Sequence, residues 1–241
     1  MNLEGRTAVV TGASSGIGAA TVRKLREAGV RVVGGARRVE RIEADLALPL
    51  DVTDEESSAA FVCRAVAELG GIDILCNNAG LALGRYPFEE STEEDEATVL
   101  HTNVDGAIRL TRLALPHIRD GGHILFTGSV AGRVAYENAA SYVAAKFAVR
   151  GFVYGLREDL LGRPIRITTV DPGLTETEFS LVRYKGDADR AKAVYEGVDP
   201  LTPEDIADCV LFAVTRPLHV NIDEIVVKAL AQSSGGRILR R

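Results

Sequence analysis

Short apolar runs alternate along the chain with longer segments in which apolar residues recur at helical spacing. The short runs predict seven β-strands, at residues 7–12, 31–36, 46–52, 72–80, 123–129, 165–173 and 224–228. The longer segments predict helices at residues 17–28, 54–70, 92–118 and 138–161, and two more after residue 186. Pro116 should end or kink the helix over 92–118, because proline lacks the backbone N–H that an inner turn requires.

This alternation indicates one fold class. Strands separated by helices form right-handed crossovers, which build a mostly parallel sheet with helices on both faces. The strand runs are apolar throughout, as a sheet covered on both faces requires. Residues 1–241 therefore predict a single α/β domain, a doubly wound Rossmann domain with a seven-stranded sheet. In such domains ligands bind beyond the carboxyl ends of the strands.

Composition excludes several classes of protein. Hydrophobic residues make up 46% of the chain and charged residues 26%, with a net charge of −6, which argues against nucleic acid as a partner. No apolar run is long enough to span a membrane, and the N-terminus lacks a signal-peptide pattern, so we expect a cytoplasmic protein. The three cysteines, Cys63, Cys76 and Cys209, are too scattered to indicate disulfides or a metal site, and we expect none.

A glycine-rich turn follows the first strand. In "TGASSGIG" (11–18), the glycines allow a sharp turn and let a phosphate approach the free amides of the next helix. Ser14 and Ser15 could add hydroxyl donors to a phosphate. The predicted cofactor contacts in this turn are Gly12, Ser14, Ser15, Gly16, Ile17 and Gly18. The alternative is a tight strand–helix turn without a ligand.

The ends of the next three strands suggest the remaining contacts of a dinucleotide. Arg37 and Arg38 follow the second strand, where an acidic residue would bind a ribose hydroxyl and arginine suits the 2′-phosphate of NADP. If they are not phosphate ligands, they are solvated surface arginines. Asp51 and Val52 are placed to hold an adenine. In "NNAG" (77–80), Asn78, Ala79 and Gly80 are candidate contacts, although both asparagines could instead satisfy the backbone.

Ser129, Tyr142 and Lys146 are the candidate catalytic residues. Tyr142 and Lys146 lie four residues apart on a predicted helix, so they share a face, and Ser129 ends the preceding strand. Moving a hydride to or from a carbinol carbon requires a proton transfer at its oxygen, and a nearby ammonium and the nicotinamide charge favour tyrosinate. Ser129 would hold the substrate oxygen, and Lys146 would also reach the nicotinamide ribose. Asn103 could hold a water that relays protons to Lys146, or could simply bond the helix backbone.

These motifs, together with "DPGLTET" (171–177), resemble the short-chain dehydrogenase/reductase family over nearly the whole chain. The resemblance implies that Tyr142 is the general acid/base and that the segment after the sixth strand lies along the nicotinamide. That segment contributes Pro172, Gly173, Thr175 and Thr177 as cofactor contacts. The chain departs from the family pattern at Thr175, where an aliphatic residue is usual. It also departs over residues 38–51, which are too few for a full third helix.

Three later stretches carry a second resemblance: "TEFSLVRYKGDADRAKAVYEG" (177–197), "PLTPEDIAD" (200–208) and "HVNIDEIVV" (219–227). They look like the NADP-dependent 3-hydroxy acid dehydrogenases, which act on serine, allo-threonine and 3-hydroxypropionate-type acids. Residues 178–198 should form a substrate lid that is mobile without substrate, followed by a polar C-terminal tail. In this lid, Arg183 and Lys185 could pair with a substrate carboxylate, or could be solvated or meet a neighbouring subunit. A related branch reduces broader carbonyls, including ketosteroids. The stretch "VKALAQ" (227–232) lacks the Met-Pro pair that is usual in the hydroxy-acid branch.

Two further expectations come from the same resemblance. A non-catalytic NADP-sensing regulator is the alternative to an enzyme, but such proteins usually lose the tyrosine or the lysine, and this chain keeps both. A homotetramer, or else a dimer, is expected, with small apolar faces of the helices over 92–118 and 138–161 at the interface. Those faces could instead cover the sheet.

Overall fold

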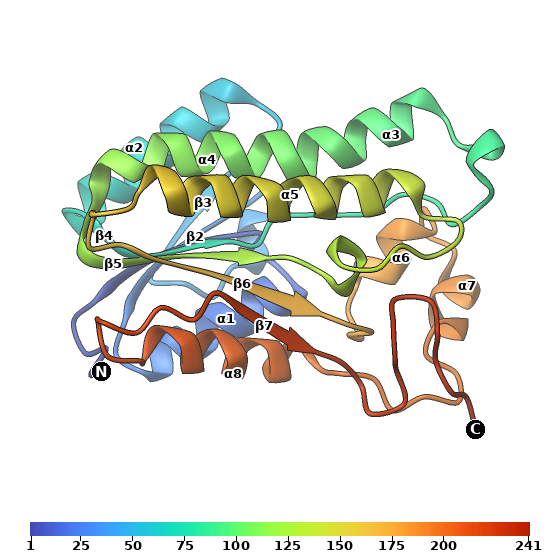
Figure 1. The fold of residues 1–241 in the computed structure, drawn as a ribbon. Coiled ribbons are helices and arrows are strands. Elements are labelled where there is room, and N and C mark those ends of the chain that lie inside the picture. Colours follow the sequence, from blue (N-terminus) through green and yellow to red (C-terminus); the bar gives the residue numbers. More distant parts are fainter.

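The computed structural model describes residues 1–241. Seven parallel strands form one sheet in the order β3-β2-β1-β4-β5-β6-β7 (Figure 1). The strands are β1 (Thr7–Thr11), β2 (Arg31–Ala36), β3 (Leu46–Pro49), β4 (Ile72–Asn77), β5 (Ile118–Thr127), β6 (Arg166–Pro172) and β7 (Glu224–Val227). The helices are α1 (Gly16–Glu27), α2 (Glu55–Leu69), α3 (Glu93–Leu100), α4 (Gly106–Ala114), α5 (Ala140–Asp159), α6 (Phe179–Arg183), α7 (Ala188–Ala193) and α8 (Pro203–Val214). The predicted fold class is confirmed.

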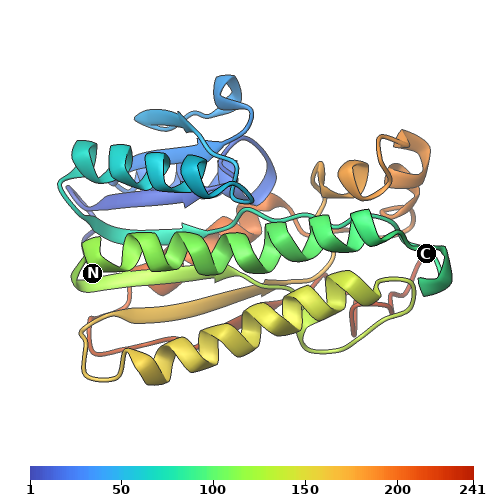
Figure 2. The ribbon, with the colours of Figure 1, turned by 90° about the horizontal axis from the view of Figure 1, so that it is seen from above.

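Helices cover both faces of the sheet. Helices α2, α4 and α5 lie over one face, and α1 and α8 lie over the other (Figures 1 and 2). Each layer has its own apolar cluster, one containing Phe61, Leu110 and Val153 and the other containing Val22 and Val210. Burial of these side chains is the main stabilising contribution to the fold. It also explains why the strands are apolar on both sides.

The topology gathers the carboxyl ends of all seven strands at one edge. The chain winds outward from β1 in both directions, so the crossovers after β1 and β4 diverge and leave a crevice there. Helices α6 and α7 stand beyond this edge, beside the C-terminal tail (Figure 1). The segment predicted as a lid is therefore next to the predicted ligand site.

The helix predicted over 92–118 is four consecutive helical pieces rather than one. Helix α3 passes into a π-helical turn (His101–Asp105) before α4, and a 3-10 turn (Leu115–His117) ends the segment at Pro116, as expected. The π turn is a local widening of the helix, of a kind often found at functional sites. It contains Asn103, which the sequence alone could not place on an irregular turn.

One strand boundary differs from the expected one, and the connection between β2 and β3 agrees with expectation. Strand β5 begins at Ile118 instead of residue 123, because Ile118 pairs with Ile72 before the register shifts. Between β2 and β3 there is only a 3-10 turn (Val39–Arg41), as the shortness of residues 38–51 predicted. The arginines after β2 therefore remain at the edge of the crevice.

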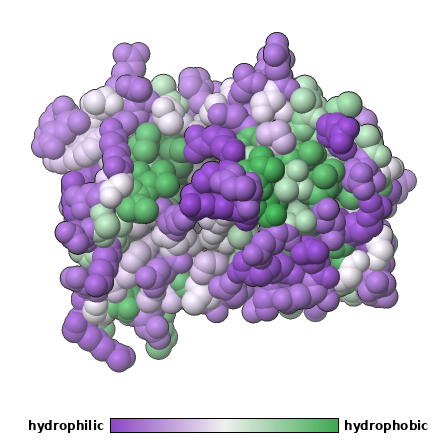
Figure 3. All heavy atoms as spheres, turned by 180° about the vertical axis from the view of Figure 1, so that it is seen from behind, coloured by the Kyte–Doolittle hydropathy of each residue, from purple (hydrophilic) through white to green (hydrophobic).

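The surface carries both hydrophobic and hydrophilic side chains. Seen from behind, hydrophobic side chains form separate patches among hydrophilic ones (Figure 3). Ion pairs between α1 and α8, Arg23 with Glu204 and Lys24 with Asp208, supply some of the exposed charge. No helix has both the length and the apolar character needed to cross a bilayer.

Candidate active site

A cleft of about 740 Å³ opens at the carboxyl ends of the strands. Its walls include most of the residues that the sequence singled out, namely Gly12, Ser14, Ser15, Gly16, Ile17, Arg37, Arg38, Asp51, Val52, Asn78, Ala79, Gly80, Ser129, Tyr142, Lys146, Pro172, Gly173, Thr175 and Thr177. The other three, Gly18, Asn103 and Arg183, lie outside this lining. Residues from six strand ends thus meet around one cavity.

The glycine turn after β1 is tightly packed against β4. A Cβ at Gly18 would lie 2.2 Å from the carbonyl oxygen of Gly12, so no side chain fits there. Gly12 itself has a φ of +66° and packs against Asn78. These constraints hold the N-terminus of α1 open toward the cleft. Gly18 therefore shapes the turn from behind and does not line the cleft.

Arg38 lies across this turn from the end of β2. Its Nη2 donates to the Ser15 hydroxyl at 3.0 Å, and Ser15 is the N-cap residue of α1. The Ser15 side chain makes no capping hydrogen bond to the helix, so its hydroxyl faces the arginine. A guanidinium, a hydroxyl and the free amides of a helix start are the donors that a phosphate group requires.

The two asparagines at the end of β4, Asn77 and Asn78, make different contacts. Asn78 donates from Nδ2 to the Thr11 carbonyl at 3.0 Å and accepts from the Thr127 hydroxyl at the same distance. Asn77 is buried and donates to the Thr111 hydroxyl. Asn78 therefore satisfies the backbone, which was the alternative left open by the sequence, whereas Asn77 bonds a side chain and its buried Oδ1 has no partner. Asn78 also lines the cleft.

Ser129, Tyr142 and Lys146 meet on the wall formed by β5 and α5. Ser129 starts a 3-10 turn, and its hydroxyl accepts from the Ala131 amide at 3.1 Å. The Lys146 ammonium is buried and donates to the Thr127 carbonyl at 2.9 Å. The same ammonium lies 5.7 Å from the centre of the Tyr142 ring. The helical spacing of four residues thus brings phenol and ammonium together, as predicted.

Burial governs the protonation of both groups. Desolvation lowers the pKa of Lys146 to about 8. Burial also raises the pKa of the Tyr142 phenol, although the Arg183 charge and the Ser129 hydroxyl act in the opposite direction. The expectation that a cation holds the pKa of Tyr142 below its ordinary value is therefore not met by the protein alone. The nearer cation is Arg183.

Asn103 lies behind this cluster. Its Nδ2 donates to the carbonyls of Leu81 and Val99, at 2.7 and 2.8 Å. Its Oδ1 is buried and has no partner. A Cβ at Gly80 would lie 2.7 Å from this oxygen and 3.6 Å from the Lys146 ammonium. An unsatisfied acceptor on the same side as a buried ammonium is what a bridging water would require.

Arg183 and Lys185, the two cations singled out in the predicted lid segment, lie in different places. The Arg183 guanidinium lies over the Tyr142 ring, 5.0 Å from its centre, and donates to the Tyr136 hydroxyl at 3.0 Å. Its Nε is buried without a partner. Lys185, in contrast, forms an ion pair with Asp95 at 2.7 Å. Of the two, Arg183 therefore faces the cluster of Ser129, Tyr142 and Lys146.

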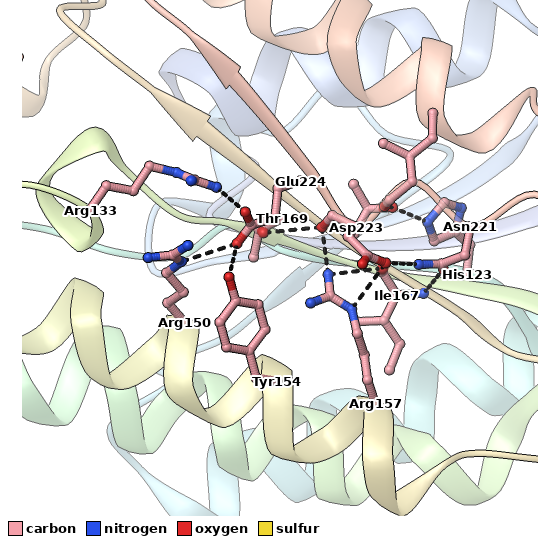
Figure 4. Close-up of polar contacts among 12 residues, drawn as sticks. His123, Arg133, Arg150, Tyr154, Arg157, Ile167, Thr169, Asn221, Asp223 and Glu224 are labelled. Carbon is pink, nitrogen blue, oxygen red and sulfur yellow. Dashed lines mark hydrogen bonds and ion pairs between the residues drawn. The ribbon is translucent and has the colours of Figure 1, made fainter.

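A network of charged side chains connects α5 and the turn after β5 to strands β6 and β7 (Figure 4). Glu224 accepts hydrogen bonds from Arg150, at 3.0 Å, and from the Tyr154 hydroxyl, at 2.7 Å, and it also pairs with Arg133. Arg133 in turn donates to Asp171 at 2.6 Å. Because Asp171 is the penultimate residue of β6 and Arg133 follows the turn that Ser129 caps, this network joins the ends of β5 and β6 beside the site.

Replacing Glu224 by Gln should lower the free energy of unfolding by about 1–3 kcal/mol at pH 7, because the partly buried guanidinium groups of Arg133 and Arg150 lose a charged partner. Partial burial raises the pKa of Glu224, but the hydrogen bonds from Tyr154, Arg133 and Arg150 outweigh it and lower that pKa to about 2. The stabilisation is therefore complete above the ordinary value of 4.5 and is lost as pH falls toward 2.

Urea unfolding of wild type and variant at pH 7 and pH 4 checks this prediction, with a smaller difference expected at pH 4. The matched control is Glu68→Gln, because Glu68 pairs with Arg31 on the exposed surface and should contribute less than about 1 kcal/mol. An equal cost for both variants, or a difference that grows at pH 4, would contradict the assignment.

The comparisons with known proteins agree with this geometry. Residues 6–186 match the family model described as short chain dehydrogenase, and the chain belongs to that family. An NADP-dependent 3-hydroxy acid dehydrogenase from Schizosaccharomyces pombe is 39% identical, with 99% of this chain and 98% of the relative covered. A serine 3-dehydrogenase from Agrobacterium fabrum is 37% identical, with 95% and 96% covered. The family resemblance seen in the sequence is thus confirmed.

Solved structures show the same likeness. A structure described as the closed form of serine dehydrogenase complexed with NADP+ superposes with a TM-score of 0.91, at 38% identity. The match covers 98% of this chain and 99% of that one. The serine dehydrogenase from Escherichia coli gives a TM-score of 0.81 at 34% identity, with 94% of this chain and 99% of that one covered.

The structure adds cleft residues that the sequence did not single out. Thr127 supplies the carbonyl that holds Lys146, and Phe179 packs its ring 5.5 Å from that of Tyr142. Glu178 lines the cleft and pairs with Arg38 and Arg41. Proximity to the "TET" motif was the only sequence signal for Glu178, because its partners lie far away along the chain.

Proposed function

We propose that the protein is an NADP-dependent oxidoreductase that interconverts a hydroxyl and a carbonyl on small 3-hydroxy acids, such as serine or 3-hydroxypropionate-type acids. One observation supports this proposal most strongly. Ser129, Tyr142 and Lys146 lie on one wall of the cleft, and the Arg183 guanidinium lies over the Tyr142 ring. The names of the relatives support NADP as the cofactor and a 3-hydroxy acid as the substrate class.

The cleft fits a dinucleotide. The open helix start at Ser15 and Gly16 suits the phosphates, with Arg37, Arg38 and Ser14 for the 2′-phosphate. The remaining cleft residues divide between the two ends of the dinucleotide. The adenine end would be held by Asp51 and Val52, and the nicotinamide end by Pro172, Gly173, Thr175 and Thr177.

The bound nicotinamide supplies the hydride acceptor or donor; the protein supplies the proton transfer. In oxidation the Tyr142 phenolate takes the hydroxyl proton of the substrate, and in reduction the phenol returns it. Ser129 donates a hydrogen bond to the substrate oxygen and stabilises the charge that develops there. Lys146 holds the cofactor ribose and, when protonated, favours phenolate. Asn103 Oδ1 would hold a water that passes protons to Lys146.

Arg183 is the residue proposed to select an acid. Its buried Nε lacks a partner, and its guanidinium is already positioned by Tyr136 and by the aromatic rings of Tyr142 and Phe179. A planar guanidinium binds a carboxylate with two parallel hydrogen bonds. An acid held there would present its hydroxyl next to Tyr142.

A broad carbonyl reductase is the second candidate, and one observation favours it. A second cavity of about 530 Å³ also borders Tyr142, and apolar side chains such as Tyr86, Phe88 and Phe147 line it. A bulky ketone, including a ketosteroid, would place its carbonyl at Tyr142 and its apolar body in this cavity. Such a substrate would not need Arg183.

Assembly and location are proposed as well. We infer a cytoplasmic homotetramer, with a dimer as the alternative. Partly exposed apolar side chains on α3 and α5, including Leu100, Phe147 and Tyr154, support an interface on these helices. Light scattering on the purified protein measures the mass of the assembly directly.

The test of the proposed function is an absorbance assay at the reduced-nicotinamide band. NADP+ is offered with serine, 3-hydroxyisobutyrate and matched neutral alcohols, and NADPH with a panel of ketones that includes a ketosteroid. The proposal expects turnover with the acids and a preference for NADP+ over NAD+. Turnover of bulky ketones alone would favour the second candidate, and no turnover with any substrate would refute both.

A further inference from the structure

The carboxylate of Glu178 lies between two arginines from the opposite side of the cleft. Arg38 Nη2 donates to its Oε2 at 2.6 Å, and Arg41 Nη1 donates to its Oε1 at 3.1 Å. Both arginines follow β2, whereas Glu178 immediately precedes the lid helix α6. The contact therefore joins the adenosine side of the cleft to the first residue of the lid.

This contact crosses the phosphate turn. Arg38 Nη2 also donates to Ser15, and both Ser15 and Glu178 line the cleft. Thr177, the neighbour of Glu178, packs on the turn, because a Cβ at Gly16 would lie 3.2 Å from Thr177 Cγ2. The start of the lid therefore rests on the turn and reaches over it to the arginines. Because Ser15, Arg38 and Glu178 all line the cleft, this connection borders the space that a dinucleotide would occupy.

The ion pairs of Glu178 with Arg38 and Arg41 hold this contact together but can open. Hydrogen bonding and charge from Arg38, with a further contribution from Arg41, lower the pKa of Glu178, so its carboxylate is ionised at neutral pH. Side-chain exposures are 42% for Arg38, 52% for Arg41 and 41% for Glu178. Ion pairs this exposed are weakened by salt and open readily. Such a contact can open and close, and it is therefore suited to controlling the release of a ligand.

We propose that Glu178 is a positioning residue that clasps the lid to Arg38 and Arg41 and thereby slows the release of the dinucleotide cofactor. The proposal rests on the cleft being the cofactor site, as proposed above. Closing segments often limit turnover through product release, so such a clasp would act on kcat as well as on cofactor affinity.

A different role for Glu178 makes the opposite prediction. If its carboxylate simply occupied the place of the 2′-phosphate on Arg38, it would compete with NADPH and would not affect NADH. Removing its charge would then tighten NADPH binding alone. The two roles therefore differ both in the direction of the effect and in the cofactor that responds.

The experiment measures dissociation rates of NADPH and NADH by stopped-flow fluorescence with Glu178→Gln. We expect both rates to rise about 3- to 10-fold, the size of effect that an exposed, charge-assisted contact supports. Raising the salt concentration should speed release from wild type toward the rate of the variant. If cofactor release limits turnover, kcat should rise with the dissociation rate, while the melting temperature stays close to that of wild type.

Two further variants make the result specific. Glu176→Gln removes the same charge two residues away, on an exposed side chain that makes no ion pair, and should leave both rates unchanged. Arg41→Ala should speed release on its own and add little to Glu178→Gln, because both changes break one contact. Unchanged rates in Glu178→Gln, or tighter binding of NADPH alone, would overturn the clasp. If wild type binds neither nucleotide, the cofactor assignment and the clasp both fail.

Discussion

Replacing Tyr142 by Phe is expected to lower kcat about 10³-fold, within the range that a positioned general acid/base contributes. The change removes the hydroxyl that exchanges a proton with the substrate oxygen and keeps the ring. That ring packs against Phe179 and beneath the Arg183 guanidinium, so the local structure should persist. Steady-state turnover and NADPH binding by fluorescence, measured on the same preparation, separate lost chemistry from lost binding.

Tyr154→Phe is the matched control for this prediction. Tyr154 lies on the same helix, but its hydroxyl donates to Glu224, the first residue of β7, and it does not line the cleft. The control should keep nearly full activity and lose only a little stability. A Tyr142→Phe enzyme that retains more than about a tenth of the wild-type kcat would exclude Tyr142 as the general acid/base.

Replacing Arg183 by Gln should lower kcat/KM for a 3-hydroxy acid about 10²-fold or more, and should change that for a matched neutral alcohol much less. A charge-assisted, two-point contact with a carboxylate is lost, and a neutral substrate never made it. Arg183 also acts against the burial that raises the pKa of Tyr142, so a smaller loss is expected with every substrate. The ratio of the two kcat/KM values isolates the contact with the acid.

Two variants control this result. Arg183→Lys keeps the charge but not the planar geometry and should recover only part of the selectivity. Lys185→Gln removes the other lid cation, which pairs with Asp95, and should leave the ratio unchanged. If Arg183→Gln lowered kcat/KM equally for acids and neutral alcohols, the residue would not select the carboxylate, and the second candidate function would gain support.

The order of strands and helices was predictable because the spacing of apolar residues shows which faces of each element are buried. Each fully apolar run became a strand of the covered sheet, and the stop at Pro116 followed from its missing N–H. The π turn around Asn103 was not predictable. Its sequence, "HTNVD", carries a helical pattern, and the hydrogen bonds of Asn103 to the carbonyls of Leu81 and Val99 within it were seen only in the structure.

The candidate site, too, was predictable from the sequence in part. The spacing of four residues predicted that Tyr142 and Lys146 share one face of a helix. The rule that ligands bind at the carboxyl ends of the strands predicted that Ser129 lies beside them, and all three residues line the cleft. Contacts between distant segments could not be predicted, because Arg38 and Glu178 are separated by 140 positions and neither carries a local signal for the other. The balance of burial against charge at Tyr142 also needed the structure, because the sequence does not say how deeply a phenol lies.

The central claim is that the protein readies the Tyr142 phenol for proton transfer only when the cofactor charge is present. The most direct measurement is an ultraviolet titration of tyrosinate, taken as wild type minus Tyr142→Phe, with and without NADP+. Without NADP+ the phenol should titrate above its ordinary pKa of ~10, because it is buried. With NADP+ bound its pKa should fall, and Lys146→Met should reverse part of that fall. A phenol whose titration does not respond to NADP+ would contradict the account.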